Sequence, residues 1–567
     1  MMQFVAVALI FAACNPTKQT IQDTPSCKFE VAESHLPQEI SRLLTSVPEK
    51  TTPRRAHCKY VAFAWENSGV TPAQLLKRAE ELDKTSIDGV GVYLSARRPD
   101  GTALKTRTIL LDPAWSFDDF AAQIPLFRQV TAHRSMKECF VNSFRSPTPG
   151  IEWEDDATWE RIANNVSVAA RVAREGGMRG LSMDLEDYSK NRPFFRKADQ
   201  MPYSDLCALV RRRGREVFGR AFAEYPNATV FAFFLHSLAP YYIRNRPCDV
   251  AALVRNAEWL LPAFLDGMMD AMPPMARLVD GDEHSYRYES ANNDYRAWAW
   301  FDRHALERLV APENLEKFRR QVLHGFSLYM DMYVNDETSS WYKGPVDDSR
   351  VEHFRRDIMQ AVETTDEYVW FWGERMCWTK WPEKRRMPDS RIANEPWESR
   401  LPGLDLAMRA ARDPVSAFDF AKDSLVKSGE LRNLVAEGGR FSVATGHVIS
   451  VVKDLKGGEW VAFSVEAKGA SASCNLVFRG DKPKPYVGDW FVPLYPVPGD
   501  PTRRVGKALV RLPTRTRRIH VVMVANNRPS ETTEFGPIEM YVVKSGEDSQ
   551  TQTKKERTDE TVQNERK

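Results

Sequence analysis

The chain has few cysteines for its length, 8 among 567 residues, and long apolar runs are equally scarce. Dispersed cysteines in this number exclude a disulfide-rich scaffold. The one long apolar run lies at the extreme N-terminus, which excludes a multi-span membrane protein. Positive charge is not in excess either, because 79 Lys and Arg face 77 Asp and Glu, a net charge of +2. We therefore expect no nucleic-acid partner bound through a basic surface.

Several catalytic signatures are also missing. The chain has no Gly-x-Gly-x-x-Gly loop after its first strand-like run, no Walker loop, no Gly-x-Ser-x-Gly elbow and no Cys-x-x-Cys pair. None of the ten histidines forms the His-x-His pair that a metal-dependent barrel hydrolase needs on its first strand. We accordingly expect no cofactor. The cysteines are predicted to pack in the core, with at most one disulfide such as Cys27–Cys58.

The N-terminus carries an export signal. Residues 4–13 (FVAVALIFAA) form an apolar run that is too short to span a bilayer and fits the core of a signal peptide. Cys14 follows two alanines, as in a bacterial lipobox, so we predict lipidation at Cys14 and membrane attachment through that lipid. An ordinary cleaved signal is the alternative. Residues 1–26 are thus a leader and linker, and we expect an exported protein: an outer-membrane or cell-surface lipoprotein, or a periplasmic or secreted protein.

From Tyr60 onward, short apolar runs alternate with amphipathic helical patterns. This alternation predicts a parallel sheet covered by helices, and eight such units over ~315 residues predict an α/β fold, a closed (β/α)₈ TIM barrel, within residues 27–400. The predicted strands are 60–66, 87–96, 138–144, 179–188, 229–237, 277–286, 325–334 and 367–374, and the clearest helical segments are 71–84, 157–177, 203–225, 249–272 and 349–365.

The pattern of apolar and polar residues changes near residue 400. Residues 401–426 carry a helical pattern that we interpret as a linker helix. Short strands of period two, separated by Gly, Pro, Asp and Asn, then predict an all-β sandwich over 427–545. Residues 546–567 contain almost no apolar side chain and are predicted to be a disordered tail.

The strongest chemical signal is GLSMDLEDY at 180–188. Catalytic groups of this barrel lie at the C-terminal ends of the strands, and the period of two places Asp184 and Glu186 on one side. Because two neighbouring carboxyls repel, one of them can hold a proton at neutral pH, as a general acid must. We predict Glu186 as general acid/base and Asp184 as its electrostatic partner or the nucleophile.

The second signal is DGDEH at 280–284, after the sixth strand. The fourth and sixth strands are next-nearest neighbours, so their ends can converge across the barrel mouth. We predict that an acid from this segment, Glu283 before Asp282, completes the catalytic pair. Two alternatives stay open. Asp-Gly is also turn chemistry, and the segment with Asp280, Asp282, Glu283 and His284 could hold Ca²⁺ through its oxygens.

Acids and aromatic residues at several strand ends suit a site that cleaves sugars. Aromatic faces stack on sugar rings, while two carboxyls share the duties of acid and of nucleophile or base. Their separation, ~5 Å or ~6.5–9.5 Å, decides between retention and inversion. The predicted substrate-binding residues are Trp65, Glu66, Asn142, Asp187, Tyr188, His236, His284, Tyr286, Asp331, Tyr333, Trp370, Trp372 and Glu374.

With these residues in view, the sequence resembles the exported (β/α)₈ glycoside hydrolases with an appended β-sandwich. GLSMDLED is similar to the D-x-E ending of barrel glycosidases and partly to chitinase-type barrels, although Ser182 replaces the first Asp of their triplet. Carboxylates on strands four and six are similar to the layout of the α-galactosidase and α-fucosidase barrels. By the same resemblance, residues 427–545 look like a carbohydrate-binding module, with Trp460, Trp490, Tyr486 and Tyr495 as candidate stacking residues.

We therefore predict a glycoside hydrolase, a monomer whose partner is a polysaccharide or glycoconjugate substrate. Two other functions stay open. One is a non-catalytic surface glycan-binding protein on a degenerate barrel. The other is a polysaccharide lyase, for which Tyr188, Tyr286 and Tyr333 offer candidate bases.

Overall fold

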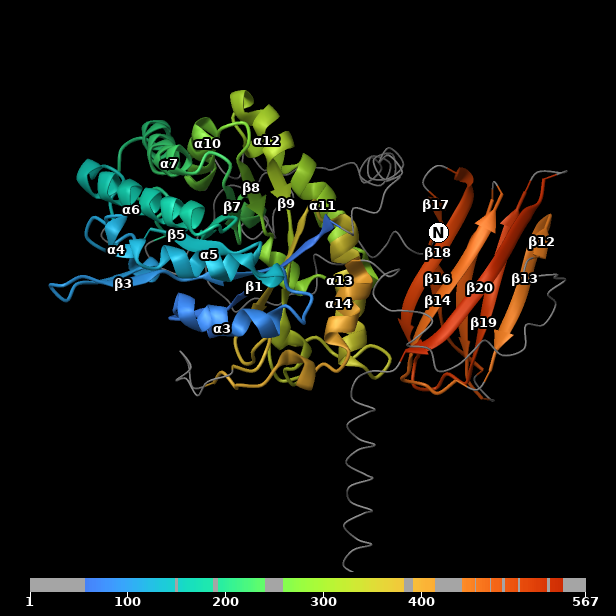
Figure 1. The fold of residues 1–567 in the computed structure, drawn as a ribbon. Coiled ribbons are helices and arrows are strands. Elements are labelled where there is room, and N and C mark those ends of the chain that lie inside the picture. The colour runs from blue at the N-terminus through green and yellow to red at the C-terminus, as the bar shows by residue number, and fades with distance from the viewer. Residues whose placement is uncertain are drawn as a thin grey trace, which may run out of the picture.

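The computed structural model shows a helix-covered barrel followed by two antiparallel sheets (Figure 1). The predicted leader, Cys14, Cys27, Asp187, Tyr188 and the C-terminal tail lie outside the described residues. The structure describes residues 57–147, 151–186, 192–239, 258–381, 391–412, 441–453, 455–469, 471–481, 485–497, 500–527 and 531–543.

The barrel is nearly closed by parallel strands in the order β10-β11-β1-β2-β5-β6-β7-β8-β9. Strands β9 and β10 are one strand interrupted at Gly325, since β9 pairs with β8 and β10 pairs with β11. All eight predicted strands are confirmed. Their bounds are β1 Lys59–Ala64, β2 Gly89–Val92, β5 Phe140–Arg145, β6 Gly180–Asp184, β7 Thr229–Ala232, β8 Arg277–Asp280, β9 Val322–His324, β10 Phe326–Tyr329 and β11 Tyr368–Gly373.

Large aromatic side chains fill the barrel interior. Phe63 lies 5.2 Å from Phe231 and 5.7 Å from Trp370 between ring centroids, and Tyr368 packs edge-on against Phe231. These rings are buried and belong to one cluster. The interior is thus a packed core, as in other barrels of this type.

The covering helices begin where the sequence supplies caps. Thr71 and Gln74 form a capping box at α3, with Pro72 in the first turn, and the Asp155 side chain accepts the Thr158 amide at α6. Gly177, with φ of +74°, ends the α6 segment as predicted. The helices are α3 Pro72–Leu82, α4 Asp118–Ala121, α5 Ile124–Ala132, α6 Asp156–Glu175, α7 Tyr203–Glu224, α10 Leu261–Ala271, α11 Asp294–His304, α12 Leu315–Gln321, α13 Arg350–Thr364 and α14 Leu404–Arg412.

Short segments connect strand ends to the helices and build the mouth. A small hairpin, β3 and β4, follows β2. Single 3₁₀ turns follow four barrel strands, so the chain bends sharply where the candidate residues lie. These elements are β3 Ser95–Arg97, β4 Ala103–Lys105, η2 Trp65–Asn67, η5 His236–Leu238, η6 Glu283–Arg287 and η10 Met330–Tyr333.

The C-terminal domain consists of a five-stranded sheet, β12-β20-β14-β18-β17, and a four-stranded sheet, β13-β19-β15-β16. Strand β15 alternates half-buried and buried residues, the period of two on which the sandwich prediction rests. The prediction of a sandwich is confirmed. The strands are β12 Phe441–Val443, β13 Thr445–Val452, β14 Trp460–Lys468, β15 Ser473–Arg479, β16 Tyr486–Val492, β17 Tyr495–Val497, β18 Asp500–Arg511, β19 Arg518–Asn526 and β20 Thr533–Val543.

Helices α13 and α14 face the sandwich (Figure 1). The Arg355 guanidinium lies over the Trp490 ring at 4.2 Å, and a Cβ on Gly403 would lie 3.0 Å from the Trp460 indole nitrogen. Thr514 donates its hydroxyl to Asp348 at 3.0 Å. Two of the four candidate stacking residues of the sandwich therefore contact the barrel domain.

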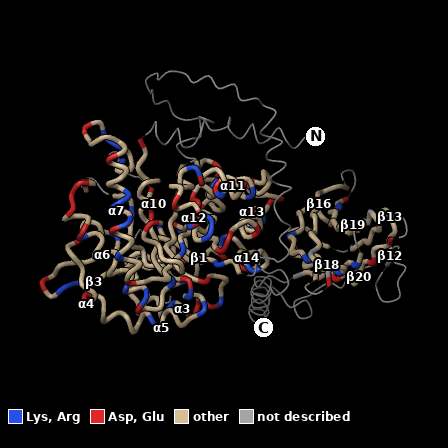
Figure 2. Tube along the Cα trace, turned by 90° about the horizontal axis from the view of Figure 1, so that it is seen from above, with Lys and Arg blue, Asp and Glu red and all other residues tan. Residues whose placement is uncertain are grey.

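Other global features can be stated briefly for the described part of the chain. None of its helices is long and apolar enough to cross a membrane. Its five cysteines form no disulfide with one another, and all but Cys207 are buried. Figure 2 shows acidic and basic residues interspersed along the outer helices.

Candidate active site

Two carboxylates stand at the end of β6. Asp184 and Glu186 are half-buried, whereas Leu185 between them is fully buried, so the two acids share the accessible side of the strand end. The Glu186 amide donates to Asp184 Oδ1 at 3.0 Å. This bond curls the chain over the strand end and fixes the two acids relative to each other.

Glu283 brings a third carboxylate to the same place. It opens η6 directly after Asp282, whose backbone is left-handed with φ of +40°. Burial raises the pKa of Glu283 well above its usual value, and the negative charges of Asp184 and Glu186 raise it further. Acids from the ends of β6 and β8 thus lie within electrostatic reach of one another.

Tyr93 adds a phenol that the sequence analysis missed. It follows β2, and burial raises the pKa of Tyr93 to about 12, with a further contribution from the charge of Asp184. The signal was present, because Tyr93 stands at the C-terminal end of the second strand, the one strand end at which no candidate was sought.

Strands β10 and β11 supply a second acidic pair. Asp331 is fully buried, and its Oδ2 accepts the Glu374 amide at 2.8 Å. Burial raises the pKa of Asp331 to about 6, and the nearby charge of Glu374 adds to that shift. The Trp372 indole donates to Glu374 Oε1 at 3.1 Å, whereas Arg375 approaches Asp331 at 3.7 Å. Glu374 is therefore held by Trp372.

An aromatic cluster borders Glu283. We define it as Tyr286, Tyr329 and Trp341, with ring centroids 5.3 Å apart for Tyr286 and Tyr329 and 5.5 Å apart for Tyr329 and Trp341. Trp341 is 38% exposed and carries the Arg287 guanidinium 4.0 Å above its ring. Tyr329 and Trp341 were not predicted. Trp341 lies in the loop after the seventh strand, where no apolar run marks a strand end.

Four predicted substrate-binding residues do not reach the mouth. Trp370 is fully buried in the barrel core and stacks on Phe233, so it cannot stack on a sugar. Tyr333 is buried and donates its hydroxyl to Asp357 on α13. Glu66 is buried and pairs with Arg78 at 2.7 Å.

His236 is the fourth of these residues. It is 2% exposed and packs edge-on against Phe318 of α12. Burial lowers its pKa to about 3, so the imidazole is neutral at physiological pH. His236 belongs to the layer between barrel and helices.

The remaining predicted residues keep positions compatible with the mouth. Trp372 is half-buried beside Phe233 and Glu374, Asn142 lies on β5 in register with Ser182, and Trp65 follows β1 under Arg391. His284 packs on Phe234 at 4.7 Å between ring centroids.

The predicted Ca²⁺ group does not assemble. The Asp280 carboxylate accepts the amides of Leu235 and Ser237 and the Ser237 hydroxyl, so its oxygens are engaged. Asp282 is buried with Asp302 and His324, and its charge also helps to raise the pKa of Glu283. The catalytic role of Asp282 stays a prediction.

Two groups in the described part of the chain have metal-ligand character: Asp282, Asp302 and His324, and Glu289, His353 and Asp357. In the first, burial and the charges of Asp282 and Asp280 raise the pKa of Asp302 well above its usual value. Burial lowers the pKa of His324 well below its usual value.

Of the predicted stacking residues in the sandwich, Tyr486 alone is described as exposed, at 53%. Trp460 is buried against Gly403, and Trp490 lies under Arg355, so both serve the domain interface. The Tyr495 side chain lies outside the described part.

No protein-family model and no curated protein sequence matches the chain. Solved structures match it weakly. A family 44 xyloglucanase from Paenibacillus polymyxa is 8% identical, with 84% of this chain and 97% of that chain covered and a TM-score of 0.29. A sugar phosphate isomerase/epimerase from Parabacteroides distasonis is 12% identical, with 65% and 97% covered and a TM-score of 0.27. The enzymatically active domain of bacteriophage CBA120 tailspike protein 4 is 13% identical, and the chain spans only 15% of its length, with 18% of this chain covered and a TM-score of 0.16. These matches assign no family and identify no reaction.

Proposed function

We propose that the protein is a glycoside hydrolase in which carboxylates from β6 and β8 act on a carbohydrate at the barrel mouth. The carrying observation is that the charges of Asp184 and Glu186 lie near enough to Glu283 to raise its pKa, on top of the effect of its burial. These acids come from the ends of strands that are not adjacent, at the end of the barrel where enzymes of this architecture place their chemistry.

The roles follow from the chemistry of glycosidic cleavage, in which one carboxyl protonates the leaving oxygen and the other acts as nucleophile or base. We assign these two duties to Glu186 and Glu283. Asp184 holds the Glu186 amide and is assigned to positioning Glu186 and to tuning its charge. Both retention and inversion are compatible with this assignment.

A carbohydrate fits the surroundings of these acids. The aromatic cluster beside Glu283 and the half-buried Trp372 offer ring faces, and aromatic faces bind the apolar side of sugar rings. Tyr93 and Glu374 add polar groups suited to sugar hydroxyls. The polysaccharide lyase alternative has one candidate base fewer, because the buried Tyr333 donates its hydroxyl hydrogen bond to Asp357.

The test is hydrolysis of a glycan library by the purified full chain and by Glu186→Gln and Glu283→Gln. We expect each variant to lose about 10²–10⁴-fold in kcat on the substrate that the wild type cleaves. Glu80→Gln, an exposed position on α3, is the matched control and should keep full activity. Unchanged turnover in either site variant would refute its role. Glycan binding by the wild type without cleavage of any library member would favour a binding protein.

We further propose that the protein acts outside the cytoplasm, since the apolar run at residues 4–13 precedes Cys14. Cell fractionation together with palmitate labelling tests this proposal. Palmitate label on the wild type and none on Cys14→Ser would support lipidation. Unlabelled wild-type protein in the periplasm or medium would support export and contradict lipidation.

A further inference from the structure

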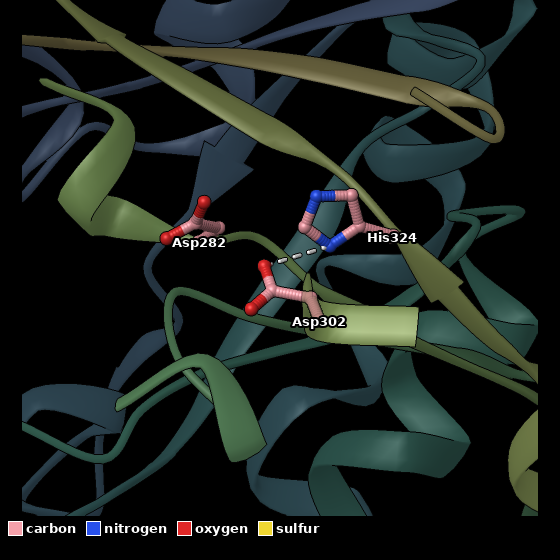
Figure 3. A group of neighbouring side chains, drawn as sticks. All are labelled: Asp282, Asp302 and His324. Atoms are coloured by element: carbon pink, nitrogen blue, oxygen red, sulfur yellow. Dashed lines mark ion pairs between the residues drawn. The ribbon is translucent and has the colours of Figure 1, made fainter. Parts of the chain in front are cut away.

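A buried cluster of acidic and imidazole groups lies at the C-terminal ends of β8 and β9 and includes none of the proposed catalytic acids (Figure 3). It joins Asp282 of the turn after β8, Asp302 of α11 and His324 of β9. Their exposed fractions are 1%, 5% and 4%, and one potential ligand atom from each lies within 4.8 Å of the others. Three separate segments thus bring donor atoms to one point in the layer between barrel and helices.

Within the described part of the chain, two members of this cluster lack ordinary hydrogen bonds. His324 Nδ1 lies 3.4 Å from Asp302 Oδ2, as Figure 3 shows, and this ion-pair contact is the one polar contact of either side chain there. Neither ring nitrogen of His324 and neither carboxylate oxygen of Asp302 forms a hydrogen bond to a described residue. Buried polar groups are almost always paired, so this arrangement requires a further partner.

The charge of the cluster points to a cation. Asp282 and Asp302 are both carboxylates, and burying such charges without compensation is unfavourable. Arg303 is a basic neighbour on α11, but its guanidinium donates hydrogen bonds to the Thr364 carbonyl and to Asp366, both at 2.9 Å. It is therefore engaged away from the cluster. Asp280 nearby is negative as well and is satisfied by amides and a hydroxyl.

The second metal-like group shows how the protein neutralises such a cluster with its own side chain. There the Lys343 ammonium lies 2.6 Å from Asp357 and 3.6 Å from Glu289. His353 uses both ring nitrogens, on the Gly344 carbonyl at 2.6 Å and on Glu289 at 2.7 Å. That group has its cation and its hydrogen bonds, so it needs no metal.

We propose that Asp282, Asp302 and His324 bind one divalent transition-metal ion, of which Zn²⁺ is the best candidate. Carboxylate oxygen and imidazole nitrogen are ordinary zinc ligands, and the imidazole argues against Ca²⁺, which takes oxygen donors. The site is not one that the sequence predicted, since the sequence analysis expected no cofactor and left open only a Ca²⁺ group at 280–284. Its burial indicates a structural role: the ion ties α11 and β9 to the left-handed turn at Asp282. The same turn leads into Glu283, so the ion would also help to position this acid. Only this effect on Glu283 rests on the proposed function.

The test uses the full chain, stripped with a chelator and then titrated with Zn²⁺ alone. We expect about one equivalent bound per chain by elemental analysis, and a rise of the unfolding temperature upon addition. Asp302→Asn and His324→Gln should each bind Zn²⁺ more than about 100-fold more weakly. His353→Gln is the matched control, and it should bind one equivalent like the wild type.

A variant that fails to fold does not remove the test. Asp302→Asn replaces a buried acid by a neutral amide, so without metal it should unfold at a higher temperature than the stripped wild type, and Zn²⁺ should raise the unfolding temperature of the wild type only. The proposal is overturned if the wild type takes up no stoichiometric Zn²⁺, or if Asp302→Asn and His324→Gln retain it. These readouts need no substrate, so they stand or fall separately from the hydrolase assignment.

Discussion

The Trp370 indole donates a hydrogen bond to the carbonyl oxygen of Gly281 at 2.7 Å, which ties the last barrel strand to the turn that carries Glu283. The ring is fully buried and stacks on Phe233, with centroids 4.5 Å apart and planes inclined by 14°. Core packing thereby sets the position of a candidate catalytic acid, since the backbone that Trp370 holds lies two residues before Glu283.

Trp370→Phe should keep the ring stack and lose the donor. The Gly281 carbonyl would lose its hydrogen bond from the indole, which costs about 1–3 kcal/mol, and the smaller ring adds a packing loss. We expect a lower free energy of unfolding by urea denaturation and a reduced kcat on the substrate. Trp341→Phe, at a 38% exposed position, is the control and should change the free energy of unfolding little. Equal effects of the two changes would contradict this view of the turn.

Gly281→Ala should damage the same turn by steric conflict. A Cβ there would lie 2.7 Å from the Ala232 carbonyl oxygen and 2.8 Å from the Trp370 indole nitrogen, both in rigid surroundings. We expect destabilisation of about 1–3 kcal/mol in urea unfolding. Gly219→Ala on α7 is the matched comparison, because its Cβ would meet only Ala271 at 3.7 Å. That variant should gain up to about 1 kcal/mol, since Ala favours helix. If Gly281→Ala were as stable as the wild type, the turn would have to accommodate the added Cβ without cost.

The barrel could be predicted because apolar runs and amphipathic helices repeat eight times in the sequence. The sequence could not predict how deep inside the barrel a residue lies. Trp370 and Trp372 share a strand face, but same-face residues lie about 6.6 Å apart along a strand and so fall in successive layers. Trp370 fills the core layer and Trp372 stands nearer the mouth, a distinction that depends on how the barrel closes.

Partners from distant segments were also invisible to the sequence analysis. Glu66 ends the first strand as a catalytic acid might, yet Arg78 of α3 pairs with it. Asp282 follows the sixth strand, yet Asp302 and His324 come from the next helix and strand. Strand order could supply only that the acids after strands four and six stand at the same end of the barrel.

The Glu66–Arg78 pair provides a prediction about stability. Both side chains are 1% exposed, and Arg78 also lies 4.2 Å above the Trp381 ring. Arg78→Met would leave the Glu66 carboxylate buried without its cation, so we expect a loss of about 3–5 kcal/mol. Adding Glu66→Gln should recover part of that loss, because the uncompensated charge disappears. A double-mutant cycle in urea measures the coupling, and simple additivity would show that the pair is not coupled.

An exposed ion pair gives the control for that cycle. Lys84 and Glu81 lie 2.6 Å apart on the surface, with exposed fractions of 68% and 48%. Lys84→Met should change the free energy of unfolding by less than about 1 kcal/mol, since solvent screens such pairs. A loss as large as that of Arg78→Met would mean that burial does not decide the effect.

The last prediction concerns pH and rests on Asp331, whose pKa in the folded protein is about 6 because its carboxyl is buried. In the unfolded chain this pKa returns to the ordinary value near 3.8. The folded state therefore prefers the protonated acid, and the protein loses stability as the pH rises from about 4 through 6, by up to about 3 kcal/mol. Asp331→Asn carries no charge and can still accept the Glu374 amide. Its free energy of unfolding relative to the wild type should therefore increase over that interval and level off near pH 7.

Urea unfolding of both proteins between pH 4 and 8 measures this difference. Asp336→Asn is a suitable control, because hydrogen bonds from Thr338 hold the pKa of the exposed Asp336 below its ordinary value, so this group is already ionised in that interval. The difference between that variant and the wild type should stay nearly constant. If the curve for Asp331→Asn also ran parallel to that of the wild type, the Asp331 carboxyl would have to be ionised throughout. Burial beside Glu374 would then not be the force that raises its pKa.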